Sequence, residues 1–308
     1  MSASAAIAGT VQVVGGIAAA PLLAGLVQTA KARLQGRRGA SPLQPYRELR
    51  RLWAKSTVTP EGTTALYRLA PAVVAASLAA AVLVTPVGAS APSFGVGQDA
   101  LVLVGLLALA RFTAAAASWD TGNGFALMGA SRDLTLSVFV EATLVLSLAV
   151  AALISGTTDL AGMVSATAGG DAWSSPALAL GAIGFALVVV AETGRQPVDN
   201  PDTHLELTMI HEGPLLEYAG RDLAYLQWAA AVRHWLVLLL AAEIFLPHPA
   251  SAWWQLGLLP AELAVLCVGL ALCETLLVKM RILLVPRLLG VGSLAALLGI
   301  AAWLAGSR

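Results

Sequence analysis

The sequence carries little charge. Only 12% of its 308 residues are Asp, Glu, Lys or Arg, whereas 58% are hydrophobic and the mean hydropathy is +0.79. Soluble domains typically contain about 25% charged residues, so this composition excludes an ordinary water-soluble fold and indicates that the bilayer is the solvent. The formal net charge is zero, which leaves no basic excess to attract nucleic acid.

Cysteine is scarce as well. Cys267 and Cys273 lie six residues apart in an apolar run, on different faces of a helix. Two such residues cannot form a metal cluster, and we expect them to pack as apolar side chains. The sequence also lacks a Walker-type loop, a dinucleotide fingerprint and a nucleophilic Ser or Cys in a recognisable setting. It therefore does not indicate a self-contained enzyme or any cofactor bound by this chain.

Long apolar runs are abundant. A membrane-spanning helix needs about 20 mostly apolar residues, and the chain has eight such runs: 5–30, 69–87, 100–118, 134–155, 176–191, 223–246, 256–278 and 288–305. The first has no basic start and no convincing cleavage site, so we expect it to be retained as a span. These runs predict an all-α, polytopic protein of about eight transmembrane helices, with residues 1–308 in a single transmembrane domain.

Lys and Arg occur only in alternate connections between these spans. The basic connections are 31–68, 119–133, 192–222 and 279–287, whereas the connections after the second, fourth and sixth spans contain no Lys or Arg. Basic residues next to spans stay on the cytoplasmic side. We therefore expect these four connections to be cytoplasmic and both termini to lie outside the cell (plasma or inner) membrane. Residues 88–97 and 156–175 are expected to be passive outer connectors.

The first basic connection contains an amphipathic segment. Leu43, Tyr46, Leu49 and Trp53 recur at helical spacing among Arg and Lys residues, which predicts a helix. Such a helix can lie in the lipid interface. Docking of a peripheral protein is an alternative that does not exclude this.

Two charges lie well inside the predicted spans. Arg111 in the third span and Glu141 in the fourth would each cost about 2.5–3.5 kcal/mol on insertion scales. They either neutralise one another as a buried pair or belong to a proton or ion path. Arg233 and Glu274 raise the same question, whereas Glu243 and Glu262 lie near the outer span ends, where a charge is cheaper.

The connection 192–222 is rich in carboxylates, namely Glu192, Asp199, Asp202, Glu206, Glu212 and Glu217. Asn200 and Pro201 predict a helix start, with a short helix from Asp202 to Glu212 that is ended by Gly213 and Pro214. Clustered acids can hold and release protons, although an ordinary solvated loop also explains them. His204 and His211 do not have a standard zinc spacing. The loop is therefore a candidate for proton handling and not for metal binding.

The same loop resembles that of a known membrane-subunit family. The run Glu192-Thr193-Gly194-Arg195-Gln196-Pro197-Val198-Asp199 resembles Glu-Thr-x-Arg-x-Pro-Phe-Asp in the family shared by the quinone-site subunit of respiratory complex I and the membrane-bound nickel-iron hydrogenases. Glu217-Tyr218-Ala219-Gly220, Leu43-Gln44-Pro45 and Met128-Gly129-Ala130-Ser131-Arg132 correspond in order and approximate spacing. The tract Asp199–Met209, followed by His211-Glu212, is similar to formate hydrogenlyase and hydrogenase-4 subunits.

This resemblance implies a subunit that anchors a peripheral redox arm and couples it to proton movement. The implied partners are a hydrogenase-like large subunit, an iron-sulfur small subunit and antiporter-like membrane subunits, and the iron-sulfur clusters and any nickel-iron centre would belong to those partners. The implied proton-coupling residues are Glu141, Glu192, Asp199, Asp202, Glu206, Glu212 and Glu217. Arg111, Arg132 and Arg195 would be structural or ion-pairing. Gln227 stands near a position where complex I relatives tend to have an acid, so an acidic path through the sixth span is in doubt.

Two alternatives remain open from the sequence. In a complex I type quinone oxidoreductase, the same loop would line a quinone cavity. In an independent cation or proton transporter, Arg111, Glu141 and Glu274 would carry the ion.

Overall fold

The protein is almost entirely helical. The structure, a computed structural model, describes residues 3–87, 97–168, 174–200, 209–249 and 252–306. Its helices are α1 (Ala3–Leu34), α2 (Gln44–Trp53), α3 (Ala65–Val84), α4 (Ala100–Asp120), α5 (Gly124–Ser155), α6 (Leu160–Thr167), α7 (Pro176–Glu192), α8 (Gly220–Phe245), α9 (Ala252–Leu276) and α10 (Val285–Gly306), with short 3₁₀ turns at Gly213–Leu215 and Ile282–Leu284. The described residues contain no β-strand, and their one isolated bridge pairs Asp99 with Asp159.

Within the described residues, seven helices are long and apolar enough to cross a membrane. The eighth predicted span, α7, is also apolar but has 17 residues, slightly fewer than the roughly 20 that span a typical bilayer. The prediction of an all-α, multi-pass membrane protein is therefore confirmed, with α7 as a short member of the bundle.

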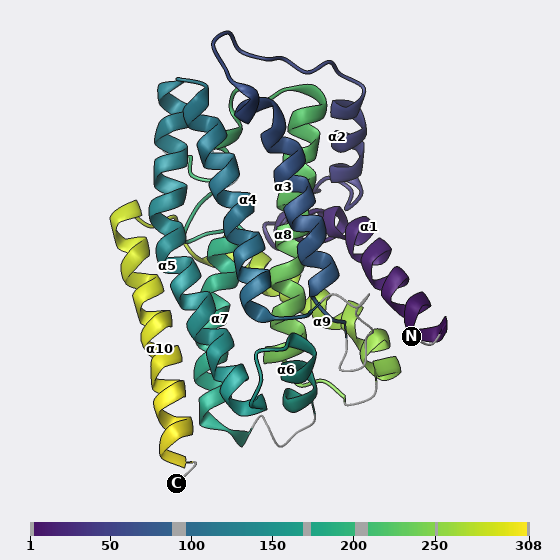
Figure 1. Ribbon diagram of the computed structural model, residues 1–308, viewed down its shortest axis with the longest axis vertical. Helices are drawn as coiled ribbons and strands as arrows, with labels where there is room; N and C mark the ends of the chain where they lie inside the picture. Colours follow the sequence, from purple (N-terminus) through teal and green to yellow (C-terminus); the bar gives the residue numbers. More distant parts are fainter. Residues whose placement is uncertain (1–2, 88–96, 169–173, 201–208, 250–251, 307–308) are drawn as a thin grey trace.

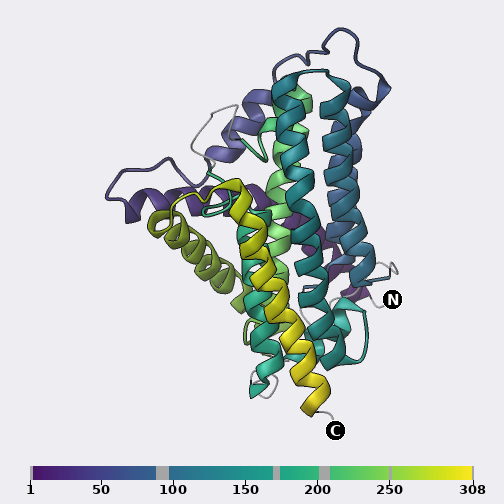
Figure 2. The same cartoon turned by 90° about the vertical axis from the view of Figure 1, so that its left-hand side faces the viewer.

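Helix α8 forms the centre of the bundle (Figures 1 and 2). It is the most buried of the candidate spans, and it packs against α1, α3 and α7. Helix α10 packs along α7 and α5, and α9 packs mainly against α1. A Cβ added at Gly184 of α7 would lie 2.9 Å from the carbonyl oxygen of Gly292 on α10, so this glycine permits the close approach of the two helices.

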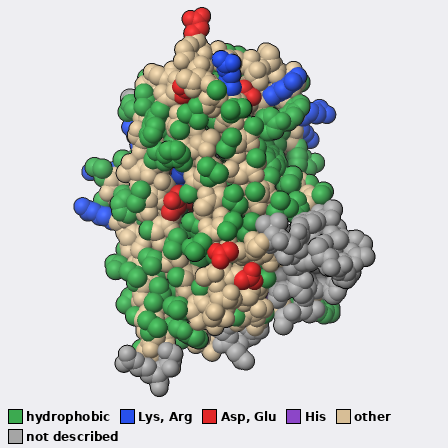
Figure 3. All heavy atoms as spheres, viewed as in Figure 1, with side chains coloured by type: hydrophobic (Ala, Val, Ile, Leu, Met, Phe, Trp, Pro, Cys, Tyr) green, Lys and Arg blue, Asp and Glu red, His purple; other side chains and the backbone are tan. Residues whose placement is uncertain are grey.

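The two ends of the bundle differ in charge. In Figure 3 the visible Lys and Arg side chains lie at the upper and middle levels, and none is visible among the coloured atoms of the lower end. The α2–α3 connection lies at the top, whereas α1 begins and α10 ends in the lower half (Figure 1). The first and last helices thus begin and end on the side away from the most basic connections.

Helix α5 begins earlier than the sequence pattern indicated. Its N-cap is Asn123, whose side-chain oxygen accepts hydrogen bonds from the backbone N–H groups of Phe125 and Ala126. Residues 124–133, expected in the connection 119–133, therefore form the first turns of α5. This places Asp133 on the same helix as Glu141, eight residues apart and close to one face.

Other elements match or depart from the sequence predictions. The amphipathic segment forms α2, with Leu52 buried and the Trp53 ring against Tyr225. The outer connection 156–175 is not wholly passive, because it contains α6, whose Leu160 and Met163 are fully buried. The predicted helix from Asp202 to Glu212 is not present over its described part, Met209–Glu212, and residues 201–208 lie outside the described residues.

Candidate functional site

A buried arginine lies at the centre of the charged residues. Arg111, on α4, is 4% exposed. Its Nη2 lies 2.7 Å from both carboxylate oxygens of Glu192 at the end of α7, and its Nη1 lies 3.1 Å from Oε1 of Glu141 on α5. Its Nε lies 3.7 Å from Oδ2 of Asp133 on α5. The ion pair considered from the sequence is therefore present, but it is part of a network from three helices.

A second guanidinium contributes to this network. Arg233, on α8, has its Nη1 4.0 Å from Oε2 of Glu192. The three carboxylates of Asp133, Glu141 and Glu192 thus face two guanidinium groups, which leaves one negative charge in excess when all are ionised. Breaking a buried pair leaves an uncompensated charge, so these groups depend on one another for their place in the bundle. We call these five residues the bundle cluster.

A second cluster lies in the loop that follows α7. Asp199 is 6% exposed. Its Oδ1 accepts a hydrogen bond from Nζ of Lys279 at 2.7 Å, and its Oδ2 lies 3.3 Å from Nδ1 of His211. Burial raises the pKa of Asp199, but hydrogen bonds and positive charge from His211 and Lys279 outweigh it and hold the pKa well below its usual value. We call Asp199, His211 and Lys279 the loop cluster.

His211 reaches toward both clusters. Its Nδ1 faces Asp199, and its Nε2 lies 3.8 Å from Oδ1 of Asp133 in the bundle cluster. Burial lowers the pKa of His211, yet the hydrogen bond to Asp199 and the negative charges of Asp133 and Asp199 outweigh it, so that the pKa lies above its ordinary value. The two carboxylates therefore stabilise the imidazolium form of His211 relative to a free histidine side chain.

Ion pairs of Glu274 hold the loop after α7 against α1 and α9. Nη1 of Arg195 lies 2.9 Å from Oε1 of Glu274 on α9, and Nζ of Lys31 at the end of α1 lies 3.5 Å from Oε2 of the same carboxylate. The backbone N–H of Met280 donates to the carbonyl of Pro197 at 2.9 Å. The loop opening is thus held by α1, α9 and the α9–α10 connection.

The second half of the loop is held by two tyrosines. The rings of Tyr67, on α3, and Tyr218 stack with centroids 4.3 Å apart. The Tyr67 hydroxyl donates to the carbonyl of Glu217 at 2.8 Å, and the Tyr218 hydroxyl donates to the carbonyl of Tyr67 at 3.0 Å. The Glu217 carboxylate accepts a hydrogen bond from the side chain of Asn123. Glu217 is therefore bound to the ends of α3 and α5.

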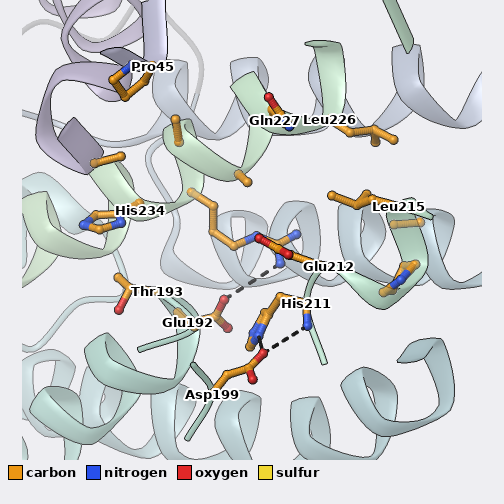
Figure 4. A pocket seen from close by; sticks show the side chains of 18 of the residues that line it. Pro45, Glu192, Thr193, Asp199, His211, Glu212, Leu215, Leu226, Gln227 and His234 are labelled. Carbon is orange, nitrogen blue, oxygen red and sulfur yellow. Dashed lines mark hydrogen bonds and ion pairs between the residues drawn. The ribbon is translucent and has the colours of Figure 1, made fainter. Parts of the chain in front are cut away.

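A cavity of about 710 Å³ connects these clusters. It lies among α1, α2, α3, α4, α5 and α8 and the loop after α7 (Figure 4). In Figure 4 the side chains of His211 and Asp199 point toward one another beside Glu192. The buried His234 also lines the cavity, and its Nε2 makes no hydrogen bond to the described residues. Charged groups of both clusters therefore face one common space.

The structure brings together only some of the predicted site residues. Arg111, Glu141 and Glu192 share the bundle cluster, and Asp199 lies in the loop cluster. Arg195 and Glu217 hold the loop through separate contacts. Glu212 and Gln227 line the cavity, and Arg132 is part-exposed on α5. Asp202 and Glu206 lie outside the described residues.

Sequence reasoning missed several members of the site, namely Asp133, His211 as a bridge between carboxylates, Lys31 and Lys279. Asp133 could have been found from its spacing to Glu141 if the helix start at Asn123 had been recognised. His211 was considered only as a metal ligand. Among the described residues, no group of three or more His, Cys, Asp or Glu side chains is placed to hold a metal ion.

Comparisons with known proteins agree with the motifs of the loop. A family model described as NADH dehydrogenase matches residues 7–304. The chain is 35% identical over 296 residues to hydrogenase-4 component C of Escherichia coli K12, which covers 93% of this chain and 92% of that protein. It is 33% identical over 285 residues to formate hydrogenlyase subunit 4 of the same organism, covering 89% and 91% of the two chains.

More distant similarity extends to the quinone branch. An NADH-quinone oxidoreductase subunit of Rhodopseudomonas palustris HaA2 is 29% identical over 252 residues, covering 77% of this chain and 76% of that protein. A chain in the structure of the membrane-bound sulfane sulfur reductase, an archaeal respiratory membrane complex, matches with a TM-score of 0.82 and 18% identity, covering 96% of this chain and 99% of the other. This last likeness shows a shared fold alone.

Proposed function

The chain belongs to the NADH dehydrogenase family, and we propose that within it the chain is the membrane-anchor and proton-coupling subunit of a multisubunit membrane-bound hydrogenase complex of the formate hydrogenlyase type. The similarity to hydrogenase-4 component C and formate hydrogenlyase subunit 4 extends over about nine-tenths of each protein. It supports this branch over the quinone oxidoreductases, whose similarity is lower and covers less of the chain.

The observation that carries the coupling part is the bundle cluster. Arg111 holds carboxylates from two different helices inside an apolar bundle, where ionisable residues are costly and normally mark ion or proton pathways. Because the cluster has an excess carboxylate, a proton can be taken up without breaking every ion pair. Glu141, Glu192, Asp199 and Glu212 face the cluster or the cavity and are the proposed proton-handling residues, and Asp202, Glu206 and Glu217 belong to the same acidic loop.

The anchoring part rests on the basic end of the bundle. Helix α2 lies at that end, whereas the α9–α10 connection, which contacts the loop after α7 through Met280 and Pro197, lies nearer mid-height (Figures 1 and 2). We propose that the side with these basic connections faces the cytoplasm of the plasma or inner membrane. A hydrogenase-like large subunit and an iron-sulfur small subunit would dock there, and antiporter-like subunits would lie beside the bundle in the membrane. Iron-sulfur clusters, and nickel-iron if the partner retains it, would belong to those subunits.

The anchoring proposal is tested by purification. An epitope-tagged chain is solubilised gently from native membranes, and its co-purifying subunits are identified by mass spectrometry. We expect hydrogenase-like large and iron-sulfur subunits, and we expect the chain to be lost from membranes when they are deleted. A chain that purifies alone and moves protons by itself in liposomes would instead be a transporter, and the proposal would be dropped.

The coupling proposal is tested with neutral substitutions. Glu141→Gln and Glu192→Gln keep a hydrogen-bonding side chain but remove the titratable proton, and Glu61→Gln in the exposed α2–α3 connection is the matched control. In inverted membrane vesicles, H₂ evolution from reduced methyl viologen and vesicle acidification are measured together. We expect acidification per H₂ to fall in the first two variants only. Normal acidification in both would remove the coupling assignment.

The cavity favours a second candidate function. Its volume of about 710 Å³ falls in the range of about 300–1,000 Å³ typical of ligand sites, and Leu78, Leu215 and Leu226 give it apolar walls beside the charged clusters. A quinone could be held there in a complex I type enzyme. Electron transfer to decylubiquinone that is blocked by a quinone-site inhibitor would favour this candidate over the hydrogenase function.

A further inference from the structure

His211 lies between two carboxylates, with one ring nitrogen facing Asp133 and the other facing Asp199. The ion pair between His211 and Asp133 joins the loop cluster to the bundle cluster, and the pair between His211 and Asp199 lies on the other side of the same ring. An imidazole can accept a proton at one ring nitrogen and release a proton from the other. Here the two nitrogens face carboxylates of different clusters. His211 is therefore placed to join them chemically.

We propose that the His211 imidazole carries protons between the loop carboxylate Asp199 and the bundle carboxylate Asp133. This inference rests on the proposed coupling function and adds to it the residue that connects the loop with the membrane. Neither His211 nor Asp133 is one of the coupling acids that the loop motifs suggested.

The proton transfer balances with ordinary acid–base steps. When His211 is neutral with its proton on Nε2, the positive charge of His211 that helps to lower the pKa of Asp199 is absent. A proton that reaches the Asp199 carboxylate in this state passes to Nδ1 of His211, and Asp199 becomes a carboxylate again. The resulting imidazolium releases its Nε2 proton to the Asp133 carboxylate, which becomes a carboxylic acid. The ring is then neutral with its proton on Nδ1, and exchange with water or rotation of the ring restores the starting tautomer.

The distances require only a small adjustment. The 3.3 Å from Nδ1 to Asp199 is close to hydrogen-bond length, whereas the 3.8 Å from Nε2 to Asp133 is longer. A short displacement of the ring or one bridging water closes this gap. The ring packs closely against Gly194, where an added Cβ would lie only 3.1 Å from Nδ1 and 3.3 Å from Cγ of His211. The absence of a side chain at Gly194 therefore allows the ring to lie between the two carboxylates.

The surrounding charges favour a residue that gains and loses a proton here. The excess carboxylate of the bundle cluster attracts the imidazolium, whereas Arg111 repels it. Lys279 already neutralises Asp199 from the other side. The groups that face His211 from neighbouring elements are Asp199 and Lys279 from the loop cluster, Asp133 from α5, Arg111 from α4, Glu192 from α7 and its chain neighbour Glu212. Their opposed effects leave both protonation states accessible.

Water can also reach this position. The side chain of His211 is 26% exposed, and His211, Asp133 and Asp199 all line the cavity. Protons can thus enter or leave the relay from the cavity, which Arg111, Asp133 and Glu192 of the bundle cluster also line.

The test uses the assembled complex in inverted vesicles. His211→Gln keeps a polar side chain of similar reach but cannot carry a proton, and His248→Gln at the other end of the bundle is the control, since the His248 ring bonds to backbone carbonyls. For His211→Gln we expect unchanged subunit composition and at least about a tenfold loss of acidification per H₂ evolved from reduced methyl viologen, because general acid–base groups typically contribute 100-fold or more. The control should retain normal acidification.

Two outcomes separate this inference from the proposed function. If His211→Gln acidifies the vesicles normally while Glu141→Gln does not, the relay is wrong and the coupling function stands. If His211→Gln, Glu141→Gln and Glu192→Gln all acidify the vesicles normally, both the relay and the coupling function fail. If His211→Gln does not assemble, Asp133→Asn tests the relay instead, since it leaves His211 in place and removes the proton acceptor. An assembled Asp133→Asn complex with normal acidification would overturn the relay.

The pH profile of acidification distinguishes the relay from a positioning role. A role in positioning alone would leave the profile unchanged in Asp133→Asn, whereas the relay predicts that the profile changes.

Discussion

Arg111 is the residue on which the largest number of buried charges depends. Replacing it with Leu would leave Glu192, Glu141 and Asp133 without their shared partner, and breaking a buried ion pair typically costs about 3–5 kcal/mol. We expect Arg111→Leu to lower the thermal stability of the detergent-solubilised complex strongly, as measured by intrinsic tryptophan fluorescence. Arg221→Ala, which removes an exposed arginine of α8, should have little effect.

A double variant separates lost pairing from lost packing. Arg111→Leu combined with Glu192→Leu removes both members of the closest ion pair, and apolar replacements of buried pairs are often neutral. Its stability should lie well above that of Arg111→Leu alone. Equal stability of the two variants would mean that the ion pair with Glu192 is not what makes Arg111 necessary.

His211 should make the stability of the loop after α7 depend on pH. Its pKa in the folded protein is raised above the ordinary 6.5, so its stabilising charge is fully present below pH 6.5 and is lost as the pH rises through the folded value. The pKa of Asp199 is lowered, so its contribution is lost only in strong acid. Between these limits the pH dependence belongs to His211.

We therefore expect hydrogen-exchange protection of the segment 209–216 to fall by roughly tenfold as the pH rises through the folded pKa, since a hydrogen bond to a charged group contributes about 1.5–3 kcal/mol. Protection factors, corrected for intrinsic exchange, are compared by mass spectrometry with those of His211→Gln. The variant should show no such step. A step of the same size in the variant would assign the pH dependence to another group.

From single residues, the sequence could predict only those members of the site that place a charge inside an apolar run. Arg111 and Glu141 were recognisable because charges inside apolar runs are costly, and their contact follows from that cost. Asp133 lies ten residues into α5, in a stretch that resembles a polar connection, and His211 looks like any loop histidine. The contact between Asp133 and His211 forms because the loop after α7 packs against α5. The spacing of residues in the sequence does not predict this packing.

At the scale of elements, the apolar composition of the sequence predicted the membrane-spanning helices, but it did not predict the short helix α6. Each of the eight apolar runs lies largely in a helix, seven of them long enough to span and α7 shorter, as expected where the bilayer requires every backbone group to be hydrogen-bonded within the segment. Helix α6 was missed because its eight residues, Leu160–Thr167, give too short a pattern in a connection rich in Gly and Thr. Asn200 and Pro201 are typical of a helix start, but Met209–Glu212 are not helical. In this stretch His211 instead contacts Asp199 through its backbone N–H and its ring.

The start of α8 depends on one glycine for its fit against the α2–α3 connection. Gly220 has a φ of +58°, and a Cβ there would lie 2.1 Å from the carbonyl oxygen of Ser56. Gly122 has a similar φ of +67° but open space around its Cα. A non-glycine residue in this region costs about 1–2 kcal/mol, so both substitutions carry the backbone cost and only Gly220→Ala adds a backbone collision.

We therefore expect Gly220→Ala to destabilise the protein clearly more than Gly122→Ala and to loosen α2. Thermal unfolding measures the first effect, and protease sensitivity of the α2–α3 connection measures the second. If the two variants behaved alike, the close contact of Gly220 with Ser56 would not be important for docking of α2 on the bundle.

For the whole molecule, the bundle cluster lies among the apolar helices α4, α5, α7 and α8, and the cavity joins it to the loop cluster after α7. The α1–α9 pair, the α5–α7–α10 group and the central α8 all contribute residues to this region or hold the loop that does. A change in the loop is therefore felt by helices on both sides of the bundle. This arrangement suits a subunit that transmits an event at its basic surface into the membrane. Under the proposed function, that surface faces the compartment of the redox partners.

This orientation gives a topology prediction. The basic residues of the connection between α1 and α3 should keep it in the cytoplasm. Seven crossings follow this connection when the shorter α7 is counted as a span, and an odd number of crossings places the C-terminus outside. Green fluorescent protein inserted after Glu61 should fluoresce, and alkaline phosphatase fused after Arg308 should be active. Exchanging the two reporters should abolish both signals, because phosphatase folds only after export and the fluorescent protein folds poorly there. The reverse pattern would place the loop after α7 outside, where a cytoplasmic hydrogenase arm could not dock on it.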